Sequence, residues 1–388
     1  MTGYPVHVEG FAYGGEAFGR LPDGRVCFFR GGAPGDTARI VLSSSKRNFA
    51  RGIMVGLDSP GSSRLAPRCP LAAVPGRASF CPGCSYQQVD YSIELRWKQR
   101  QLSDFLVRGG LAGEETLRPP VPAPSRFGWR NRLKLSASGG NTGFFTEDNI
   151  TVIPVEHCPL AAAELDAVLP ERRRELRNGE VFLRWTAADG VVVNGGTRML
   201  TEELPGIGRF KVPAESFFQT NIQVAARLVD DVRGILRELR PSRMLELYCG
   251  VGVFSLAAAA ALPDMRTWGI ELDAAAIRHA SGNAAAWGLG ERCRFRCGKA
   301  ERTDPSRCCG SLPDVLLLDP PRRGIPPELA GRIREWKIPK VVYISCAPDT
   351  LARDLRVLSG AYRVERCGLY DMFPCTGHFE TLVLLGLK

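Results

Sequence analysis

The sequence predicts a multidomain α/β protein: a small N-terminal β-barrel, a mostly β central domain with a cysteine cluster, and a C-terminal doubly wound domain. Three observations lead to this prediction. Short apolar runs separated by glycine-rich turns fill residues 1–58, cysteines from distant segments recur in residues 59–212, and strand and helix patterns alternate over residues 213–388. A chain of 388 residues is long enough for two or three such domains.

The barrel is predicted from four strand-like runs. They are Val6–Ala12, Arg25–Arg30, Thr37–Ser43 and Phe49–Leu57. Gly14–Gly15 and Asp23–Gly24 supply turns between them. The barrel either binds a polyanion or serves only for packing, and the runs themselves do not distinguish these roles.

Four cysteines of the central region suggest a ligand site. They are Cys69, Cys81, Cys84 and Cys158. Four thiolates from two distant segments suit a tetrahedral zinc ion or an iron–sulfur cluster, and unligated thiols are the third possibility. Thirteen cysteines in a chain without a signal-peptide pattern indicate reduced thiols, so we expect a cytoplasmic protein.

Basic residues are frequent in the rest of the central region. Residues 91–108 have apolar side chains near helical spacing, and we expect this helix to pack on the C-terminal domain. Arg130, Arg132 and Lys134 alternate along one strand, which places three cations on one face. That face is either simply solvated or a stripe that contacts phosphates.

The C-terminal domain is predicted from repeated strand–helix units. A helix over Asn221–Leu239 precedes five strands: Met244–Tyr248, Thr267–Glu271, Arg294–Cys297, Asp314–Asp319 and Lys340–Ser345. Helical patterns between the strands indicate a mostly parallel sheet with helices on both faces. Ligands of such sheets bind at the carboxyl ends of the strands.

The first strand of this sheet is followed by Gly250 and Gly252, where the backbone can approach a ligand closely. A dinucleotide fingerprint requires a third glycine, but this chain has Ser255 there. The loop therefore suits S-adenosylmethionine, which has no pyrophosphate, better than NAD. Glu271 ends the second strand and can hold a ribose diol, and Asp319 ends the fourth strand at the same edge.

Cys346 lies on the loop that leaves the last of these five strands. Pro348 ends the strand pattern, and Asp349 or Thr350 is expected to cap the following helix. A thiolate at this position can attack an electron-poor carbon. The alternative is that Cys346 is a small buried apolar side chain.

The overall charge favours a polyanionic partner. The chain has 51 basic and 41 acidic residues, a net charge of +10 and a pI of about 9.1. No apolar run reaches the length of a membrane span, so we expect no membrane partner.

Five motifs resemble those of the RNA uracil-5-methyltransferases, and they occur in order over nearly the whole chain. They are FFQTN (217–221), LYCGVGVFSLA (247–257), DPPRRG (319–324), SCAPDTLARD (345–354) and MFPCTGHFET (372–381). Residues 9–40 resemble a TRAM domain, a small barrel that binds RNA. CPGCSYQQVDY (81–91) is similar to the cluster loop of the family's ribosomal-RNA members.

The resemblance implies specific roles for these residues. Cys346 is the nucleophile and Glu380 is the base, brought beside Cys346 by a last strand that is inserted antiparallel. The resemblance also assigns four residues to the methyl donor or to the site that the donor shares with the target nucleobase. They are Gln219, Tyr248, Glu271 and Asp319. Cys69, Cys81, Cys84 and Cys158 hold a [4Fe-4S] cluster in preference to zinc, although eleven residues separate Cys69 from Cys81 where better-known members have five.

The predicted function is methylation of uridine C5 in RNA by a monomeric enzyme that uses S-adenosylmethionine, with 23S ribosomal RNA as the favoured substrate. Methylation of the T-loop uridine of tRNA is the first alternative. A cytosine-5-methyltransferase and a non-catalytic RNA-binding module are more remote, because the first has different motifs and the second leaves Cys346 and Glu380 unexplained.

Overall fold

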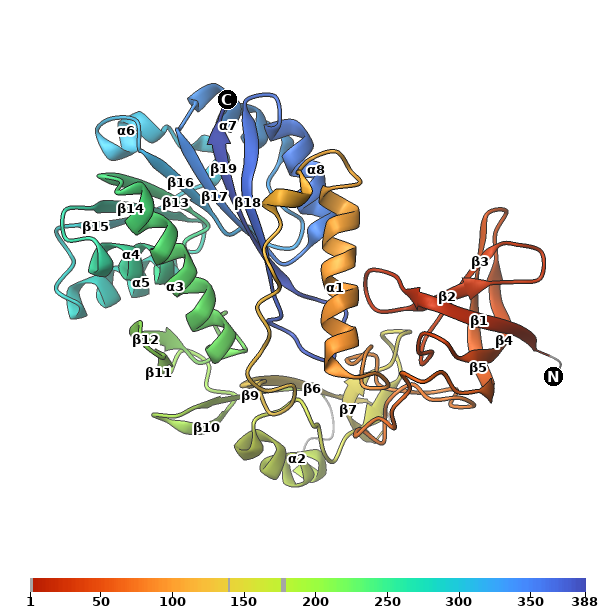
Figure 1. Ribbon diagram of the computed structural model, residues 1–388. Coiled ribbons are helices and arrows are strands. Elements are labelled where there is room, and N and C mark those ends of the chain that lie inside the picture. Colours follow the sequence, from red (N-terminus) through yellow and green to blue (C-terminus); the bar gives the residue numbers. More distant parts are fainter. Residues whose placement is uncertain (1–2, 139, 176–178) are drawn as a thin grey trace.

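The computed structural model describes residues 3–138, 140–175 and 179–388. A small barrel, a central β layer and a larger α/β domain are joined around one long helix (Figure 1). The predicted fold class is confirmed. In the described part of the chain, no helix is long and apolar enough to cross a membrane.

The barrel is closed, with strand order β1-β2-β3-β5-β4. Its strands are β1 (Tyr4–Phe11), β2 (Ala17–Arg20), β3 (Val26–Phe29), β4 (Thr37–Ser45) and β5 (Phe49–Ser59). The sequence did not predict β2, because it is four residues long and contains Gly19. A Cβ at Gly19 would lie 2.0 Å from the His7 carbonyl oxygen, so the glycine permits a close strand crossing that weakens the strand pattern.

The central layer contains a five-stranded sheet of order β10-β9-β6-β7-β8. Its strands are β6 (Arg132–Ser138), β7 (Asn141–Phe145), β8 (Val152–Pro154), β9 (Gly179–Thr186) and β10 (Gly190–Val193). Helix α2 (Ala163–Glu175) packs Leu165 and Leu169 against Leu133 and Leu183 of the sheet. No clear helical pattern in the sequence predicts α2, which contains Pro170.

The three alternating cations of the central region do not form one free stripe. Arg130 precedes β6 and lines a cavity between cysteines. The guanidinium of Arg132 donates to the Glu215 and Ser216 carbonyls, and Lys134 lies 2.6 Å from Glu180. These side chains therefore already have structural partners.

A hairpin links the central layer to the C-terminal domain. It consists of β11 (Met199–Leu204) and β12 (Gly208–Pro213). The buried Arg184 guanidinium pairs with Glu202 at 2.7 Å and donates to the Pro213, Ala214 and Ser216 carbonyls. It thereby fixes the chain just before Gln219.

The C-terminal sheet has seven strands in the order β15-β14-β13-β16-β17-β19-β18. They are β13 (Arg243–Leu247), β14 (Arg266–Glu271), β15 (Cys293–Cys297), β16 (Val315–Leu318), β17 (Lys340–Ser345), β18 (Tyr362–Tyr370) and β19 (Glu380–Leu387). Strand β19 runs antiparallel to both of its neighbours, β17 and β18. The expected antiparallel insertion of the last strand is thus observed.

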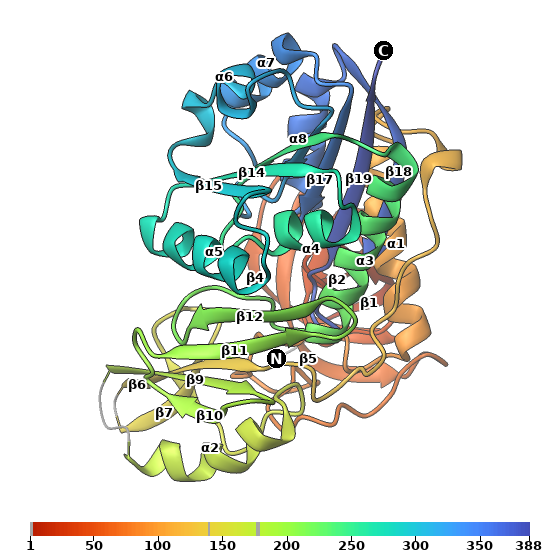
Figure 2. The ribbon, with the colours of Figure 1, turned by 90° about the vertical axis from the view of Figure 1, so that its left-hand side faces the viewer.

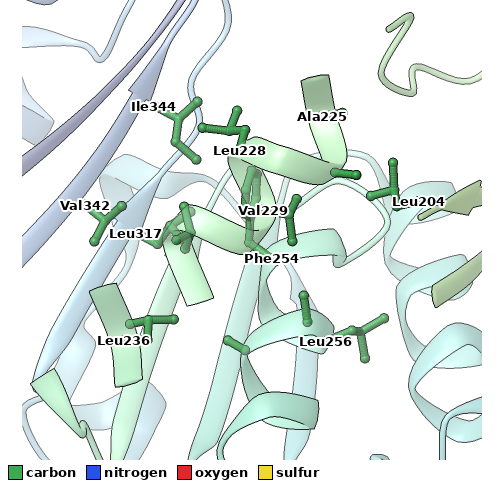
Figure 3. Close-up of a cluster of buried hydrophobic side chains, with 14 of the residues drawn as sticks. Leu204, Ala225, Leu228, Val229, Leu236, Phe254, Leu256, Leu317, Val342 and Ile344 are labelled. Carbon is green, nitrogen blue, oxygen red and sulfur yellow. The ribbon is translucent and has the colours of Figure 1, made fainter. Parts of the chain in front are cut away.

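Helices cover both faces of this sheet (Figure 2). One face carries α3 (Ile222–Leu239), α4 (Val253–Ala261) and α5 (Ala274–Ala286). Figure 3 shows that core, where Leu228 and Phe254 from α3 and α4 meet Leu317, Val342 and Ile344 of the strands. The other face carries α1 (Tyr91–Leu106), α6 (Pro305–Cys309), α7 (Pro327–Trp336) and α8 (Pro348–Leu358). Two short 3₁₀ turns, Glu114–Thr116 and Ala300–Arg302, lie in the connections.

Helix α1 stands between the barrel and the C-terminal sheet (Figure 1). Leu102 and Leu106 pack into the core of the sheet. On the barrel side, the Trp97 ring lies 6.0 Å from the Phe11 ring, and the Gln101 amide donates to the Phe11 carbonyl. The helix is therefore shared by both cores.

A fully buried ion group joins α1 to the loop between β18 and β19. Lys98, Glu94 and Asp371 are each 0% exposed. The Lys98 ammonium lies 2.7 Å from both carboxylates and 3.2 Å from the Phe373 carbonyl. Burial lowers the pKa of Lys98, but the two carboxylates outweigh this and raise it above its usual value.

Replacing Lys98 by methionine should destabilise the protein strongly. The substitution leaves Asp371 buried without a cation and Glu94 with Arg126 alone, at 3.1 Å, and removing one partner of a buried ion group costs about 3–5 kcal/mol in the free energy of unfolding. Urea unfolding followed by circular dichroism measures this loss. Lys340→Met, which removes a half-exposed ion pair with Glu365, is the matched control and should cost less than about 1 kcal/mol. Equal losses for both variants would contradict the structural role of the buried group.

Candidate active site

The pairing of β17 with β19 brings Cys346 and Glu380 to the same place. Ser345 and Thr381 are the last partners in this antiparallel ladder. The next pair along the ladder is therefore Cys346, which directly follows β17, and Glu380, which is the first residue of β19. Cys346 is half-buried and Glu380 is buried. Both lie at the carboxyl edge of the parallel strands, where such sheets bind ligands.

The helix after Cys346 begins without the side-chain cap that the sequence predicts. Helix α8 begins at Pro348 with Ala347 as its N-cap, and no side chain caps it, so neither Asp349 nor Thr350 has the predicted role. The Thr350 hydroxyl instead lies 3.0 Å from both the Ala347 and Arg322 carbonyls, to which it can donate. The N-cap residue Ala347 has no polar side chain, so it cannot accept from the free N–H groups of the first turn.

Asp354 of α8 fixes the loop that follows β16. Its carboxylate accepts hydrogen bonds from the Ile325 N–H at 2.9 Å and the Tyr343 hydroxyl at 2.6 Å. Gly324 has a φ of +71°, and a Cβ there would lie 2.4 Å from the Asp354 carboxylate. This close approach sets the path of the loop that carries Asp319 and Arg322.

The loop from Asp371 to Phe379 is held by three parts of the protein. The Cys375 N–H donates to Glu94 of the buried ion group at 2.7 Å. Its carbonyl accepts from the Ser85 N–H at 2.7 Å and the Tyr86 N–H at 3.1 Å. A Cβ at Gly377 would lie 2.3 Å from the Gly14 carbonyl of the barrel. We call residues 371–379 the catalytic loop, because it ends at Glu380.

Titratable groups at this edge perturb one another. Burial raises the pKa of Cys346 to about 12, with further increases from Glu380 and Asp319, while Arg322 opposes them. Burial and Asp319 also raise the pKa of Glu380 well above its usual value. Burial and the neighbouring Glu271 raise the pKa of Asp319 to about 7. Such crowding of perturbed groups in one place is typical of active sites.

Arg322 is the cation that faces these groups. Its Nη2 lies 2.6 Å from Nδ1 of His378. Burial and the Arg322 charge lower the pKa of His378 to about 4, so its imidazole is neutral near pH 7 and can accept a guanidinium N–H.

The glycine-rich loop after β13 has an open backbone surface. Tyr248, Gly250 and Gly252 all have positive φ, at 66°, 52° and 85°. The Glu271 carboxylate accepts from the Leu272 N–H at 2.7 Å and the Gly250 N–H at 3.3 Å. Glu271 thus sits directly against the loop, at the end of the adjacent strand.

Gln219 lies on the segment that enters α3. Its carbonyl accepts from the Asn131 amide at 3.3 Å, and the Asn221 amide donates to the Met372 carbonyl at 3.2 Å. This places residues 219–221 beside the catalytic loop. Phe217, which the sequence did not single out beyond the FFQTN motif, is 73% exposed.

The four cysteines of the central region line one cavity of about 160 Å³. Cys69, Cys81, Cys84 and Cys158 share it with Arg130 and His157 among others. Gln87 bridges two of them, accepting from the Cys69 N–H at 3.0 Å and donating to the Cys84 sulfur at 3.1 Å. Among residues 3–138, 140–175 and 179–388, no group of three or more His, Cys, Asp or Glu side chains is arranged to hold a single metal ion.

The barrel also reaches the site, which the sequence did not indicate. Tyr13, in the turn between β1 and β2, packs its ring 6.1 Å from the Phe379 ring. Arg322, Asp349 and Cys346 are among the titratable groups that act on its hydroxyl. No local pattern distinguishes this tyrosine, because only the docking of the barrel gives it these neighbours.

Comparison with known proteins identifies two regions. Residues 197–292 and 311–388 match the family model of the tRNA (uracil-5-)-methyltransferases, and residues 2–55 match the TRAM domain. An uncharacterised RNA methyltransferase of Thermosynechococcus vestitus is 28% identical, over 98% of this chain and 97% of that protein. One from Streptomyces coelicolor is also 28% identical, over 98% and 92% of the two chains.

The fold agrees with these matches. The crystal structure of Pyrococcus abyssi tRNA (uracil-54, C5)-methyltransferase in complex with S-adenosyl-L-homocysteine has a TM-score of 0.75 to this chain. The two are 22% identical, and the similarity covers 98% of this chain and 99% of the other. The chain belongs to the TRAM-containing, S-adenosylmethionine-dependent RNA (uracil-5-)-methyltransferases.

Proposed function

We propose that this enzyme methylates C5 of a uridine in 23S ribosomal RNA through a covalent bond between Cys346 and C6 of the base. The observation that carries the mechanism is the position of Cys346 opposite Glu380 at the end of the β17–β19 ladder. A thiol and a carboxylate on one side of the uracil ring can act on two adjacent carbons, the thiol on C6 and the carboxylate on the proton of C5.

The residues at the carboxyl edge fit S-adenosylmethionine. Gly250 leaves open space beside the backbone for a close ligand, Gly252 makes room for the Phe295 ring of β15, and Glu271 is placed to accept from ribose hydroxyls. Tyr248, Gln219 and Asp319 complete the proposed site. When bound, the cofactor supplies an electrophilic methyl group on a sulfonium sulfur.

Cys346 begins the reaction by attacking C6. A thiol whose pKa is about 12 is protonated near pH 7, so the S–H proton must leave as the S–C6 bond forms. Asp319, whose pKa is raised to about 7 by burial and Glu271, is partly ionised and available as the acceptor. The electrons of the C5–C6 double bond move toward the C4 oxygen, which makes C5 nucleophilic.

Glu380 completes the reaction after C5 has taken the methyl group. Its carboxylate, whose ionised form Arg322 favours against the effect of burial, removes the C5 proton, the C5–C6 double bond re-forms, and the Cys346–C6 bond breaks. The thiolate recovers a proton from Asp319. Because the thiol and carboxylate are half-buried or buried, the uridine must leave its stack to reach them. The exposed Phe217 ring is a surface on which a displaced base can stack.

The four-cysteine cavity supports a [4Fe-4S] cluster. A single zinc ion needs four sulfurs about 2.3 Å from one point, hence about 3.8 Å apart. The four cysteines line a common cavity, and the resemblance of CPGCSYQQVDY (81–91) to the family's cluster loop favours a [4Fe-4S] cluster over zinc there. Bound there, the cluster would serve the RNA-binding surface, because methyl transfer from a sulfonium requires no electron.

The choice of ribosomal RNA rests on the combination of a TRAM barrel with the cysteine cavity, which resembles the family's ribosomal-RNA members. A tRNA T-loop uridine is the second candidate, because the structure with a TM-score of 0.75 is that of a tRNA (uracil-54, C5)-methyltransferase. We place the enzyme in the cytoplasm as a monomer, where either RNA is available.

Cys346→Ala should abolish turnover, with a loss on the order of 10⁴-fold or more, because no other group can form the C6 bond. It should also abolish covalent protein–RNA adducts. Transfer of a labelled methyl group to RNA measures the first effect, and denaturing electrophoresis measures the second. Cys308→Ala, which removes a half-buried thiol on α6, is the control and should retain full activity. Substantial turnover by Cys346→Ala would show that the mechanism is wrong.

Glu380→Gln should instead accumulate the adduct. The amide cannot remove the C5 proton, so the reaction stops after methyl transfer and leaves a denaturant-resistant protein–RNA species. Glu365→Gln, on the outer strand β18, is the matched control and should show no accumulation. Free methylated RNA released by Glu380→Gln at the normal rate would assign the base to another residue.

Anaerobically purified protein should be brown and contain about four iron and four acid-labile sulfide atoms per chain. Cys158→Ser should lose this content because it removes one of the four proposed ligands, whereas Cys297→Ser, an exposed thiol on β15, should keep it. Metal analysis and the visible spectrum provide the measurement. Colourless protein with one zinc ion per chain would overturn the cluster assignment.

Protein-free 23S ribosomal RNA should be methylated in preference to unmodified tRNA. The two RNAs are offered separately to the purified enzyme with labelled S-adenosylmethionine, and the product nucleoside is identified by mass spectrometry. Preferential methylation of the tRNA T-loop would change the substrate and leave the mechanism intact.

A further inference from the structure

The turn between β1 and β2 presents Tyr13 at the tip of the barrel. The Gly15 N–H donates to the Ala12 carbonyl at 2.9 Å, and Gly14 and Gly15 adopt φ values of 91° and 83° that favour glycine. The Tyr13 ring packs edge-on against Phe379 at 6.1 Å and against Phe105 of α1 at 5.5 Å. Phe379 directly precedes Glu380, so the Tyr13 ring contacts the residue next to the proposed base. We call the Phe379 side chain the Phe379 wall of the site.

The tip of the barrel is fixed at this position by several contacts. The Gly14 carbonyl accepts from the Arg30 guanidinium and the Ser85 hydroxyl, both at 3.2 Å. The same carbonyl lies where a Cβ on Gly377 would stand. Ser85 in turn donates its N–H to Cys375 of the catalytic loop. Tyr13 is therefore held in a defined place relative to the catalytic loop.

Arg322 reaches the same wall, because its Nη2 lies 2.6 Å from Nδ1 of His378, the residue before Phe379, and Arg322 is among the charges that act on the Tyr13 hydroxyl. Burial and Asp349 raise the pKa of Tyr13 to about 12 against the opposing effect of Arg322, so the phenol stays protonated. Its oxygen can accept an N–H of Arg322 while its proton remains available to donate. Arg322 faces Cys346 and Glu380, whose negative forms it stabilises.

We propose that Tyr13 is a positioning residue of the catalytic pocket, through which the TRAM barrel orients Arg322 toward Cys346 and supports the Phe379 wall beside Glu380. The inference rests on the proposed covalent mechanism at Cys346. It gives the barrel a part in the chemical step, in addition to any part it has in holding RNA.

The test compares Tyr13→Phe with the unaltered enzyme and with Tyr4→Phe, an exposed tyrosine of the same barrel. Tyr13→Phe keeps the ring contacts and removes only the hydroxyl. We expect kcat to fall about tenfold while KM for RNA stays within about twofold, because the proposed interaction of the hydroxyl with Arg322 orients a charged group that acts in the chemical step. Tyr4→Phe should change neither constant.

A second measurement does not depend on RNA. Iodoacetamide labelling of Cys346, followed by mass spectrometry at one fixed alkaline pH, reports the ionised fraction of the thiol. Tyr13→Phe should slow labelling about threefold or more, because a less well oriented Arg322 stabilises the thiolate less. Tyr4→Phe should label at the unaltered rate, and equal melting temperatures of the variants show that the fold is retained.

The outcomes separate the two proposals. A kcat and a labelling rate that are both unchanged in Tyr13→Phe would overturn the positioning role and leave the proposed function untouched. A raised KM with an unchanged kcat would make Tyr13 an RNA-binding residue and also overturn it. Absence of methyl transfer by the unaltered enzyme would refute the proposed function, while the labelling rates would still decide whether Tyr13 acts on Cys346.

Discussion

The ion group of Lys98, Glu94 and Asp371 is the interaction on which the rest of the site depends. Three charges are held out of water, and this is tolerable only while each has its partners. Tyr91 adds a hydroxyl at 2.7 Å from Asp371. The group joins residues that are far apart in sequence, so α1 and the catalytic loop have one allowed arrangement. The ion group thus fixes the path of the loop that leads to Glu380, while the β17–β19 ladder places Glu380 opposite Cys346.

The catalytic loop is also where the three parts of the protein meet. The barrel contacts it through Gly14, the central region through the Trp129 ring at 6.1 Å from Phe373, and the cysteine segment through Ser85. Ser85 follows Cys84 directly. A ligand bound to Cys84 would therefore be one residue away from the hydrogen bond that the Ser85 N–H donates to the Cys375 carbonyl of the loop. The barrel, the central region and the cysteine segment are thus all in direct contact with the loop that leads to Glu380.

Electrostatics at the sheet edge suit a cationic methyl donor. Glu271, Asp319 and Glu380 place three carboxyl groups there, and burial raises the pKa of Asp319 and Glu380, so a cation bound at this edge would favour their ionised forms. A sulfonium ion is attracted to this edge, whereas the neutral thioether that remains after methyl transfer is not. The same field disfavours a thiolate at Cys346, which explains why the opposing charge of Arg322 and its orientation matter for the chemistry.

The sequence by itself determined the fold class, the order in which strands and the loops with reactive side chains follow along the chain, and the identity of the candidate groups. Alternating apolar patterns specified the parallel strands, and Gly250, Gly252, Glu271, Asp319 and Cys346 follow directly from strand ends. It missed β2, whose four residues contain a glycine, and α2, whose helical pattern is interrupted by proline. It also misassigned the cap of α8, because the helix already begins at Pro348, which places Asp349 and Thr350 inside the helix and Ala347 at the cap position.

Tertiary structure alone decided which distant residues share the site. Tyr13 and Cys346 are separated by most of the chain, and their proximity arises because α1 packs on both the barrel and the sheet. Burial then set the protonation of Cys346, Asp319 and Glu380, since the pKa of a side chain depends on solvent and charges that its sequence neighbours do not define. Local sequence specifies elements and reactive groups, whereas long-range packing specifies their distances and charges.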